Sequence, residues 1–319
     1  MPDDRLIRRR LRLRDLDTLM AVAQTGSMAK AAVRLSVSQP AVSKAIGEME
    51  QTLGYRLLDR TAQGVEPNIY GRALLKCGTA MFDDLRQGLN ELDFIADPTL
   101  GELRIGAAEP LVTGLLPVII TRLTRRHPRL TFHVTQLHSM PLFDELIERR
   151  ADLIVARIFP SMLRREFDAE VLFNEPQFVA AGLNNPWARR RRIELSELID
   201  EPWTLPDPAT IAGKLVGDTF RACGLNYPHT RVVCNSIQMH SALLSTGNYL
   251  AMFPRSMIRF AGERLSARIL PVKLPPQKAP IGIIRLKDRT ISPVAQLFID
   301  CAREVAKPLA DADDGRASA

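Results

Sequence analysis

Residues 16–72 constrain the fold of this chain most strongly, because their apolar spacing and turn residues describe three short helices followed by a β-hairpin. The first helix carries apolar residues at helical spacing, namely Leu16, Leu19, Met20 and Ala23. We expect this helix to stop at Gly26 and a second helix to begin after Ser27, a suitable N-cap. Ser36 and Val37 then form a tight turn, so the pattern predicts a helix-turn-helix.

The third helix is predicted to begin after Ser38, with Pro40 in its first turn, where the missing N–H costs little. Its expected apolar face consists of Ala41, Val42, Ala45, Ile46, Met49 and Leu53. The opposite face is small and polar, which allows a helix to lie deep in the major groove of DNA. A short three-helix domain that merely exposes these polar residues is the alternative reading.

A β-hairpin is predicted next, with strands at 55–60 and 65–68 and a tip at 61–64. Arg60 flanks this tip and is placed to reach phosphate or the minor groove. Gln can pair with adenine, and Lys can contact guanine or phosphate. The candidate DNA-binding residues are Ser27, Arg34, Ser38, Gln39, Pro40, Ser43, Lys44 and Arg60.

This stretch resembles the LysR-type transcriptional regulators. The shared pattern comprises Ala31 and Ala32, the Ser-Gln-Pro-Ala-Val-Ser run at 38–43, Glu50, Leu53 and Gly54, and the wing residues Leu58 and Arg60. The chain departs from the family pattern at Leu58, where Phe is usual, and at Tyr70. The segment 245–257 resembles the branch that contains the galactose-binding-protein regulator and the protocatechuate-pathway regulator.

The composition is consistent with an anionic partner. The chain has 319 residues and a formal net charge of +7, a length that allows two or three domains. The early Arg-Arg pair is not followed by the apolar core of a signal peptide, and no segment has the roughly 18 consecutive apolar residues of a membrane span. We therefore expect a cytoplasmic protein without membrane association.

Cysteine and histidine spacing gives no support for a metal site or a cofactor. The four cysteines, Cys77, Cys223, Cys234 and Cys301, lack a C-x-x-C pairing, and the five histidines lack ligand spacing. A redox switch formed by Cys223 and Cys234, similar to that of peroxide-sensing family members, is a minor alternative.

A single long helix is predicted over about residues 68–95, followed by a break at Asp97, Pro98 and Gly101. Its apolar residues occupy heptad positions: Leu74, Met81, Leu85, Leu92 and Ile95. We expect Gly78 and Gly88 to weaken the same stripe. The resemblance implies that this helix pairs with its twin in a homodimer, which is further paired into a homotetramer; packing on its own chain is the alternative.

Strands and helices alternate from Gly101 onward, which predicts a two-lobed α/β domain. The overall fold is therefore expected to be α+β: a winged helix-turn-helix at 12–72, a linker helix at 68–97 and an effector domain at 101–307 resembling periplasmic binding proteins. Lobe 1 is expected at about 101–168 and 277–307, lobe 2 at about 169–276, and a disordered tail at 308–319.

A small ligand is expected between the lobes, at the carboxyl ends of parallel strands and beside helix N-termini. An arginine after the third strand could hold a carboxylate through two parallel hydrogen bonds. The candidate effector-binding residues are Ala108, Glu109, Thr113, His138, Ser139, Arg157, Pro206, Asn235, Ser236 and Phe253. Each also has a structural reading: Asn235 as a helix cap, Arg157 as a surface ion pair and Phe253 as core.

Three classes of function are the alternatives for a chain with this organisation. A ligand-responsive regulator, with double-stranded DNA and a sugar or organic acid as partners and RNA polymerase as a candidate further partner, accounts for all three parts of the chain. An enzyme is not expected, since the sequence has no phosphate loop, no G-x-S-x-G motif and no paired carboxylates with metal spacing. A DNA binder that responds to no ligand is the third class, and a sealed cleft would favour it.

Overall fold

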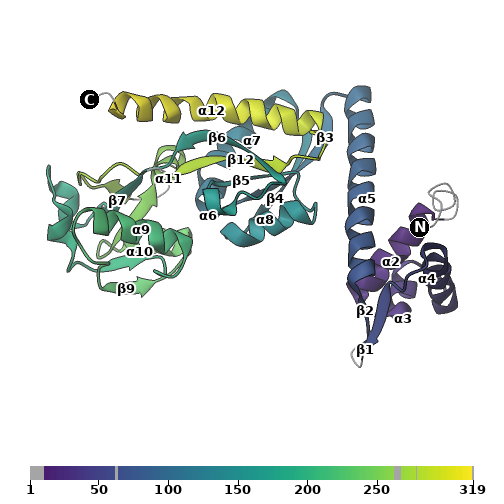
Figure 1. Cartoon of the computed structure of the whole chain (residues 1–319). Helices are drawn as coiled ribbons and strands as arrows, with labels where there is room; N and C mark the ends of the chain where they lie inside the picture. The colour runs from purple at the N-terminus through teal and green to yellow at the C-terminus, as the bar shows by residue number, and fades with distance from the viewer. Residues whose placement is uncertain (1–10, 62–63, 262–266, 278, 318–319) are drawn as a thin grey trace. The chain divides into compact units, whose positions relative to one another are not determined.

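The computed structural model describes residues 11–61, 64–261, 267–277 and 279–317. The chain forms two compact units, Met1–Leu89 and Asn90–Ala319 (Figure 1).

Three short helices form the core of the first unit: α2 (Leu13–Thr25), α3 (Met28–Arg34) and α4 (Gln39–Leu53). Gly26 ends α2 in the left-handed conformation, with φ of 64°. The side chains of Ser27 and Ser38 accept hydrogen bonds from Lys30 N and Ala41 N, and so cap α3 and α4 as predicted. On α4, Val42, Ile46 and Met49 are buried, whereas Ala41 is exposed and does not belong to the apolar face.

A two-stranded hairpin, β1 (Leu58–Thr61) and β2 (Gly64–Pro67), projects beside α3 (Figure 1). Glu50 Oε1 accepts a hydrogen bond of 2.7 Å from Leu57 N, which ties the start of the hairpin to α4. Val65 N donates to Gly26 O at 2.9 Å, and a Cβ on Gly64 would lie 2.3 Å from that same oxygen. Close backbone approach therefore holds the start of β2, next to the hairpin tip, against the end of α2.

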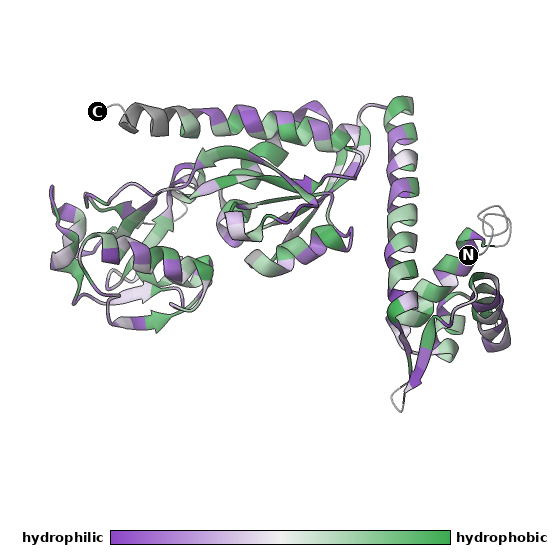
Figure 2. Ribbon diagram, viewed as in Figure 1, coloured by the Kyte–Doolittle hydropathy of each residue, from purple (hydrophilic) through white to green (hydrophobic). Residues whose placement is uncertain are grey.

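Helix α5 (Ile69–Ala96) is the long helix expected from the sequence. Asn68 begins it, since its side chain accepts hydrogen bonds from Tyr70 N and Gly71 N. Its outer apolar residues are exposed in the single chain, with exposed fractions of 49% for Leu85 and 63% for Leu92. Figure 2 shows hydrophobic positions recurring along the helix.

The expectation for Gly78 was wrong. Gly78 is buried, and a Cβ there would lie 3.7 Å from both Leu16 Cβ and Met20 Sδ, so it faces α2 and not the exposed stripe. Gly88 is exposed with open space around it. A small residue at position 78 lets α5 pack closely on α2.

The second unit contains two five-stranded sheets, and the first has the strand order β4-β3-β5-β12-β6. Its strands are β3 (Leu100–Ala107), β4 (Arg129–Gln136), β5 (Leu153–Arg157), β6 (Phe167–Asn174) and β12 (Pro280–Leu286). Its helices are α6 (Glu109–Thr113), α7 (Leu115–Arg126), α8 (Ser139–Ile147) and α12 (Pro293–Ala317), and the 3-10 helix η1 (Pro160–Met162) follows β5. β3, β4 and β5 run parallel, and their buried apolar residues pack in one core with those of α7 and α12.

The second sheet has the order β11-β7-β10-β8-β9. Its strands are β7 (Gln177–Gly182), β8 (Trp203–Leu205), β9 (Thr230–Val233), β10 (Leu250–Pro254) and β11 (Ala267–Ile269). Its helices are η2 (Pro186–Arg189), η3 (Leu195–Leu198), α9 (Ile211–Ala222), α10 (Ile237–Ser245) and α11 (Arg255–Ala261). Trp203, Phe220 and Phe253 are fully buried within this lobe.

Two expectations about the second unit were wrong in detail. β6 lies at the edge of the first sheet, so the chain first crosses between lobes at 175–176 and not near residue 169. The helical segment after β3 is divided into α6 and α7 at Gly114, where a Cβ would lie 3.1 Å from Met257 Cα, so glycine permits close approach of α11.

The expected disordered tail is helical as far as Ala317, beyond Pro308. Val305, Ala306 and Leu309 are buried in the core of the first lobe, and this packing outweighs the hydrogen bond that proline removes. The last residues, 318–319, lie outside the described part of the chain.

Candidate functional site

The exposed face of α4 is the first candidate site. Gln39, Pro40, Ser43, Lys44 and Gly47 are all exposed, and their spacing of three and four residues places them on one side of the helix. The buried residues of α4 lie on the other side, so the polar face is free of intramolecular packing. A helix of this kind can enter the major groove.

Charged groups extend this face. The Lys44 side chain is 77% exposed and lies 3.8 Å from Glu48 Oε1, a pair that solvent screens strongly and that leaves the ammonium available to an anion. Arg34 is exposed in the last turn of α3, and Arg60 is exposed in β1. Ser27 is half-buried at the start of α3.

The two departures from the family pattern are packing features. Tyr70 stacks on Tyr55, with ring centroids 4.6 Å apart, and Leu58 packs on both small apolar clusters of the helical core. Neither residue lies on α4. The polar face of α4 is therefore unchanged by them.

The second candidate site is a cavity of about 400 Å³ between the two lobes of the second unit. It opens at the carboxyl ends of parallel strands β3, β4 and β5 in one lobe and of β8 and β9 in the other. Ligand sites in α/β sheets form at such ends, and the volume falls in the usual range of about 300–1,000 Å³. The cavity can hold a small organic molecule.

Six of the predicted effector residues line this cavity: Ala108, Glu109, His138, Arg157, Pro206 and Asn235. Three do not. Thr113 donates its hydroxyl to Glu109 O, Ser236 caps α10, and Phe253 is fully buried in the second lobe. Ser139 is the first residue of α8, but its side chain lies outside the described part of the chain.

Four polar residues on the wall were not predicted: Glu175, Gln177, Thr210 and His240. Glu175 lies where the chain crosses between lobes, and the misplaced lobe boundary concealed it. Thr210 precedes a helix and caps it through Gly213 N, a signal that the sequence does carry. His240 follows Ile237 by one helical turn, a spacing that resembles a core position.

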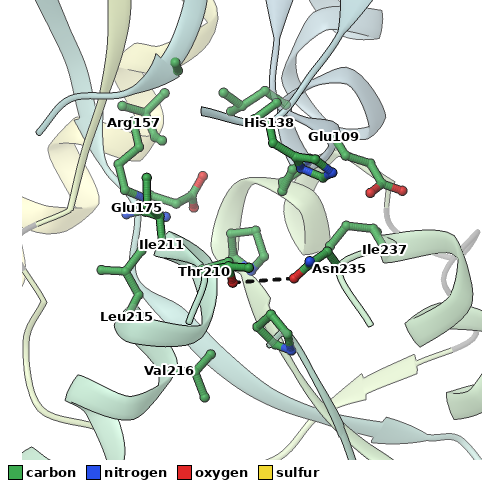
Figure 3. Close-up of a pocket in the computed structure, with 18 of the residues that line it drawn as sticks. Glu109, His138, Arg157, Glu175, Thr210, Ile211, Leu215, Val216, Asn235 and Ile237 are labelled. Atoms are coloured by element: carbon green, nitrogen blue, oxygen red, sulfur yellow. Dashed lines mark hydrogen bonds between the residues drawn. The ribbon is translucent and has the colours of Figure 1, made fainter. Parts of the chain in front are cut away.

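Arg157 and Glu175 lie together at the crossing between lobes (Figure 3). Arg157 Nη1 donates to Ala279 O at 3.1 Å, and Glu175 N donates to the same oxygen at 3.0 Å, so both crossing segments are tied at one carbonyl. Burial lowers the pKa of Arg157 to about 10, while the charge of Glu175 acts in the opposite direction. The guanidinium therefore stays charged at neutral pH.

Glu175 is 1% exposed and holds the first turn of α11. Its Oε1 accepts from Ser256 N at 2.8 Å, and its Oε2 accepts from the Ser256 hydroxyl at 2.5 Å. Burial raises the pKa of Glu175, although both Ser256 hydrogen bonds and the charges of Arg157 and Arg255 partly offset this effect. The cavity wall thus contains a carboxylate that resists ionisation more than an exposed one.

His240 is the corresponding buried group in the second lobe, with 3% of its surface exposed. Its Nδ1 lies 2.8 Å from the Thr204 hydroxyl. Burial lowers the pKa of His240, with a backbone hydrogen bond at Cys234 and the charge of Glu109 opposing the shift. The ring is therefore neutral at neutral pH.

The described residues include no group of three or more His, Cys, Asp or Glu side chains that could hold a metal ion. Within the same residues, no helix is both long and apolar enough to cross a membrane.

Comparisons with known proteins agree with this architecture. Residues 13–72 match the family model described as bacterial regulatory helix-turn-helix protein, lysR family, and residues 96–307 match the LysR substrate binding domain. The chain belongs to the LysR family. It is therefore a DNA-binding transcriptional regulator with an effector-binding domain, and the family and fold class expected from the sequence are confirmed.

Relatives match along nearly the whole length of this LysR-family chain. It is 27% identical over 303 residues to the HTH-type transcriptional regulator GbpR of Azospirillum brasilense, covering 95% of this chain and 89% of GbpR. It is 24% identical over 306 residues to PcaQ of Agrobacterium fabrum, covering 96% and 98%. The crystal structure of CbnR, a LysR-family regulator, matches with a TM-score of 0.63 at 21% identity, over 93% of this chain and 99% of CbnR, and shows the shared fold.

Proposed function

We propose that this regulator binds double-stranded DNA through α4 and the β1–β2 hairpin and responds to a small organic molecule in the cavity between its lobes. The observation that carries the ligand response is the cavity itself, which both lobes line and which is open enough to admit a ligand. A ligand that binds one degree of lobe closure more tightly than another shifts the equilibrium between them. That shift would change the DNA-bound assembly and the bend it imposes.

The base-reading residues proposed are Gln39, Ser43 and Lys44, with Arg60 holding the hairpin against the DNA backbone. The proposed assembly is a homodimer through α5, paired further into a tetramer, that spans an imperfect palindrome. The exposed apolar residues of α5 support it, because a stripe of this length is stabilised by a partner helix. RNA polymerase is a further proposed partner.

The alternatives have less support. A regulator without a ligand is disfavoured by the open cavity. A redox switch is disfavoured because burial and the charge of Glu194 raise the pKa of Cys223, which lowers the thiolate fraction that oxidation needs.

The experiment is a DNA footprint of the full chain upstream of its own gene, with and without a panel of sugars and aromatic acids. A protected palindrome whose extent changes with one compound is the expected result. Ala212→Trp should abolish the change, since Ala212 lines the cavity from an exposed position on α9, whereas Ala222→Trp at the end of the same helix should not. Regulation that survives Ala212→Trp unaltered would refute the cavity as the effector site.

A further inference from the structure

The cavity offers a ligand few unengaged polar groups. Among the described residues, Glu175 already accepts two hydrogen bonds from Ser256, and His240 is bonded to Thr204. Glu109 accepts from the backbone of α10 at 3.4 Å. These groups are committed to holding the protein together, so each is less available to a ligand.

Arg157 is the main exception. Within the described part of the chain its only hydrogen-bond acceptor is Ala279 O, contacted by Nη1, although a guanidinium has five N–H donors. Arg157 also lines the cavity at the carboxyl end of β5. Its remaining donors form a planar fork, which suits the two oxygens of a carboxylate.

Two amides, together with His138, supply more of the available polarity. Asn235 Oδ1 receives the Thr210 hydroxyl at 3.5 Å, which leaves its amide N–H groups available. Gln177 Oε1 is buried and has no hydrogen-bond partner among the described residues. Both line the cavity, and each can orient one polar substituent of a ligand.

Most of the remaining wall is apolar. It includes Leu111, Phe159, Ile211, Leu215, Val216 and Met252. Each sugar hydroxyl buried here without a partner would lose its hydrogen bonds to water without replacement, which disfavours binding. The wall therefore suits an aromatic or branched aliphatic body and not a hexose.

The charges at the two ends limit the ligand to one carboxylate. Figure 3 shows Arg157 beside Glu175 on one side of the cavity and Glu109 near His138 on the other. A second carboxylate reaching the far side would meet the buried side chain of Glu109. Repulsion between like charges in a buried site makes a dicarboxylate a poor fit.

We propose that the effector is a small organic monocarboxylate with an apolar body, whose carboxylate pairs with Arg157 and whose body packs on α9 and β10. This inference rests on the proposed ligand response and names the ligand class of the same cavity. It also assigns a role to Glu175, because the charge of Glu175 acts on Arg157 and would repel a carboxylate bound there. Glu175 therefore lowers the affinity of the cavity for a carboxylate.

The test uses the full chain and matched probe pairs in calorimetry. The panel comprises aromatic and branched aliphatic monocarboxylates, beginning with benzoate and 4-methylpentanoate, together with their primary amides, phthalate and D-galactose. We expect binding by monocarboxylates, and at least about tenfold weaker binding by the corresponding amides, as for the loss of one member of a close charge pair.

Two variants at the crossing act in opposite directions. Arg157→Gln should weaken carboxylate binding by at least about tenfold, and Glu175→Gln should strengthen it by a similar factor, since the competing charge is gone. Gln at 175 can still accept from Ser256 N and donate to the Ser256 hydroxyl, so α11 stays anchored. Tighter carboxylate binding by Glu175→Gln cannot result from unfolding. It therefore tests the charge effect even if Arg157→Gln fails to fold.

Binding of D-galactose or phthalate in preference to every monocarboxylate would overturn the ligand class, as would amides that bind as tightly as acids or an absence of binding by any acid in the panel. A sugar that binds and changes the DNA footprint would refute this class and leave the proposed function intact. A monocarboxylate that binds through Arg157 and leaves the footprint unchanged would support the class and refute the ligand response.

Discussion

The hydrogen bond from Leu57 N to Glu50 Oε1 should control the hairpin that carries Arg60. Leu57 is 1% exposed, and its amide donates to this carboxylate at 2.7 Å just before β1 begins. Glu50→Ala would leave that N–H buried without its acceptor, a loss of about 1–3 kcal/mol. Glu50→Gln keeps a neutral acceptor and should cost about 1 kcal/mol less.

Hydrogen exchange measured by mass spectrometry on the full chain can report this locally. A loss of about 2 kcal/mol in the local opening free energy corresponds to roughly thirtyfold faster exchange of the amides around Leu57. Glu48→Ala is the matched control, since Glu48 lies on the same helix and makes only an exposed ion pair with Lys44. In Glu48→Ala, the amides near Leu57 should exchange at the same rate as in the wild-type protein.

The same variants should separate in DNA binding. When Glu50→Ala loosens β1, Arg60 loses its fixed position, so affinity should fall by no more than it falls in Arg60→Ala. Glu48→Ala removes an exposed carboxylate near Lys44, so its affinity should stay equal or rise. Equal exchange rates around Leu57 in Glu50→Ala and in the wild-type protein would refute the anchoring argument.

Three further predictions address base reading, pH dependence and assembly. Gln39→Ala or Ser43→Ala should weaken specific DNA binding by roughly 1–3 kcal/mol and leave nonspecific binding nearly unchanged, as a salt-controlled binding titration would measure; an equal fall in both would exclude base reading. The raised pKa of Glu175 means that the folded state retains this proton more strongly than the unfolded state, so its contribution to stability is present at low pH and is lost as pH rises through the folded pKa. Melting curves recorded from pH 5 to 8 should therefore show Glu175→Gln gaining stability over wild type as pH rises, and parallel curves would contradict this. Leu85→Asp combined with Leu92→Asp should shift sedimentation toward the monomer, since both side chains are exposed in the single chain, and an unchanged mass would remove α5 from the interface.

The helical part of the first unit was predictable because its signals are local. Ser27 and Ser38 cap helices through bonds to residues three positions away, and Gly26 ends a helix through its own backbone conformation. The face of α4 followed from the same spacing, although Ala41 was assigned to the wrong side. What the sequence did not reveal was the bond between Glu50 and Leu57, which depends on the path of the chain between them.

The cavity between the lobes was predicted only in part, since its wall joins segments that are distant in sequence. Strand ends located Arg157 and His138 correctly on the wall, because a parallel strand order brings such ends together. The failures depend on tertiary contacts: Ser236 is used as a cap, Phe253 as core, and Glu175 lies at a crossing whose position depends on β6 pairing with β12. The apolar pattern of β6 does not indicate which of the two sheets this strand joins.

The contacts at the point where the chain crosses between the lobes give a physical reason why a ligand in the cavity would change the relative position of the lobes. Arg157 comes from the first lobe, Glu175 from the segment between lobes, and Ser256 from the helix after β10 in the second lobe. A carboxylate bound at Arg157 adds a negative charge near Glu175, the residue that holds α11. Because α11 lies against Gly114 of the first lobe, the same change reaches both lobes at their contact. Ligand charge and lobe position are thus coupled through one buried carboxylate, and replacing Glu175 with Gln should weaken that coupling even where it strengthens binding.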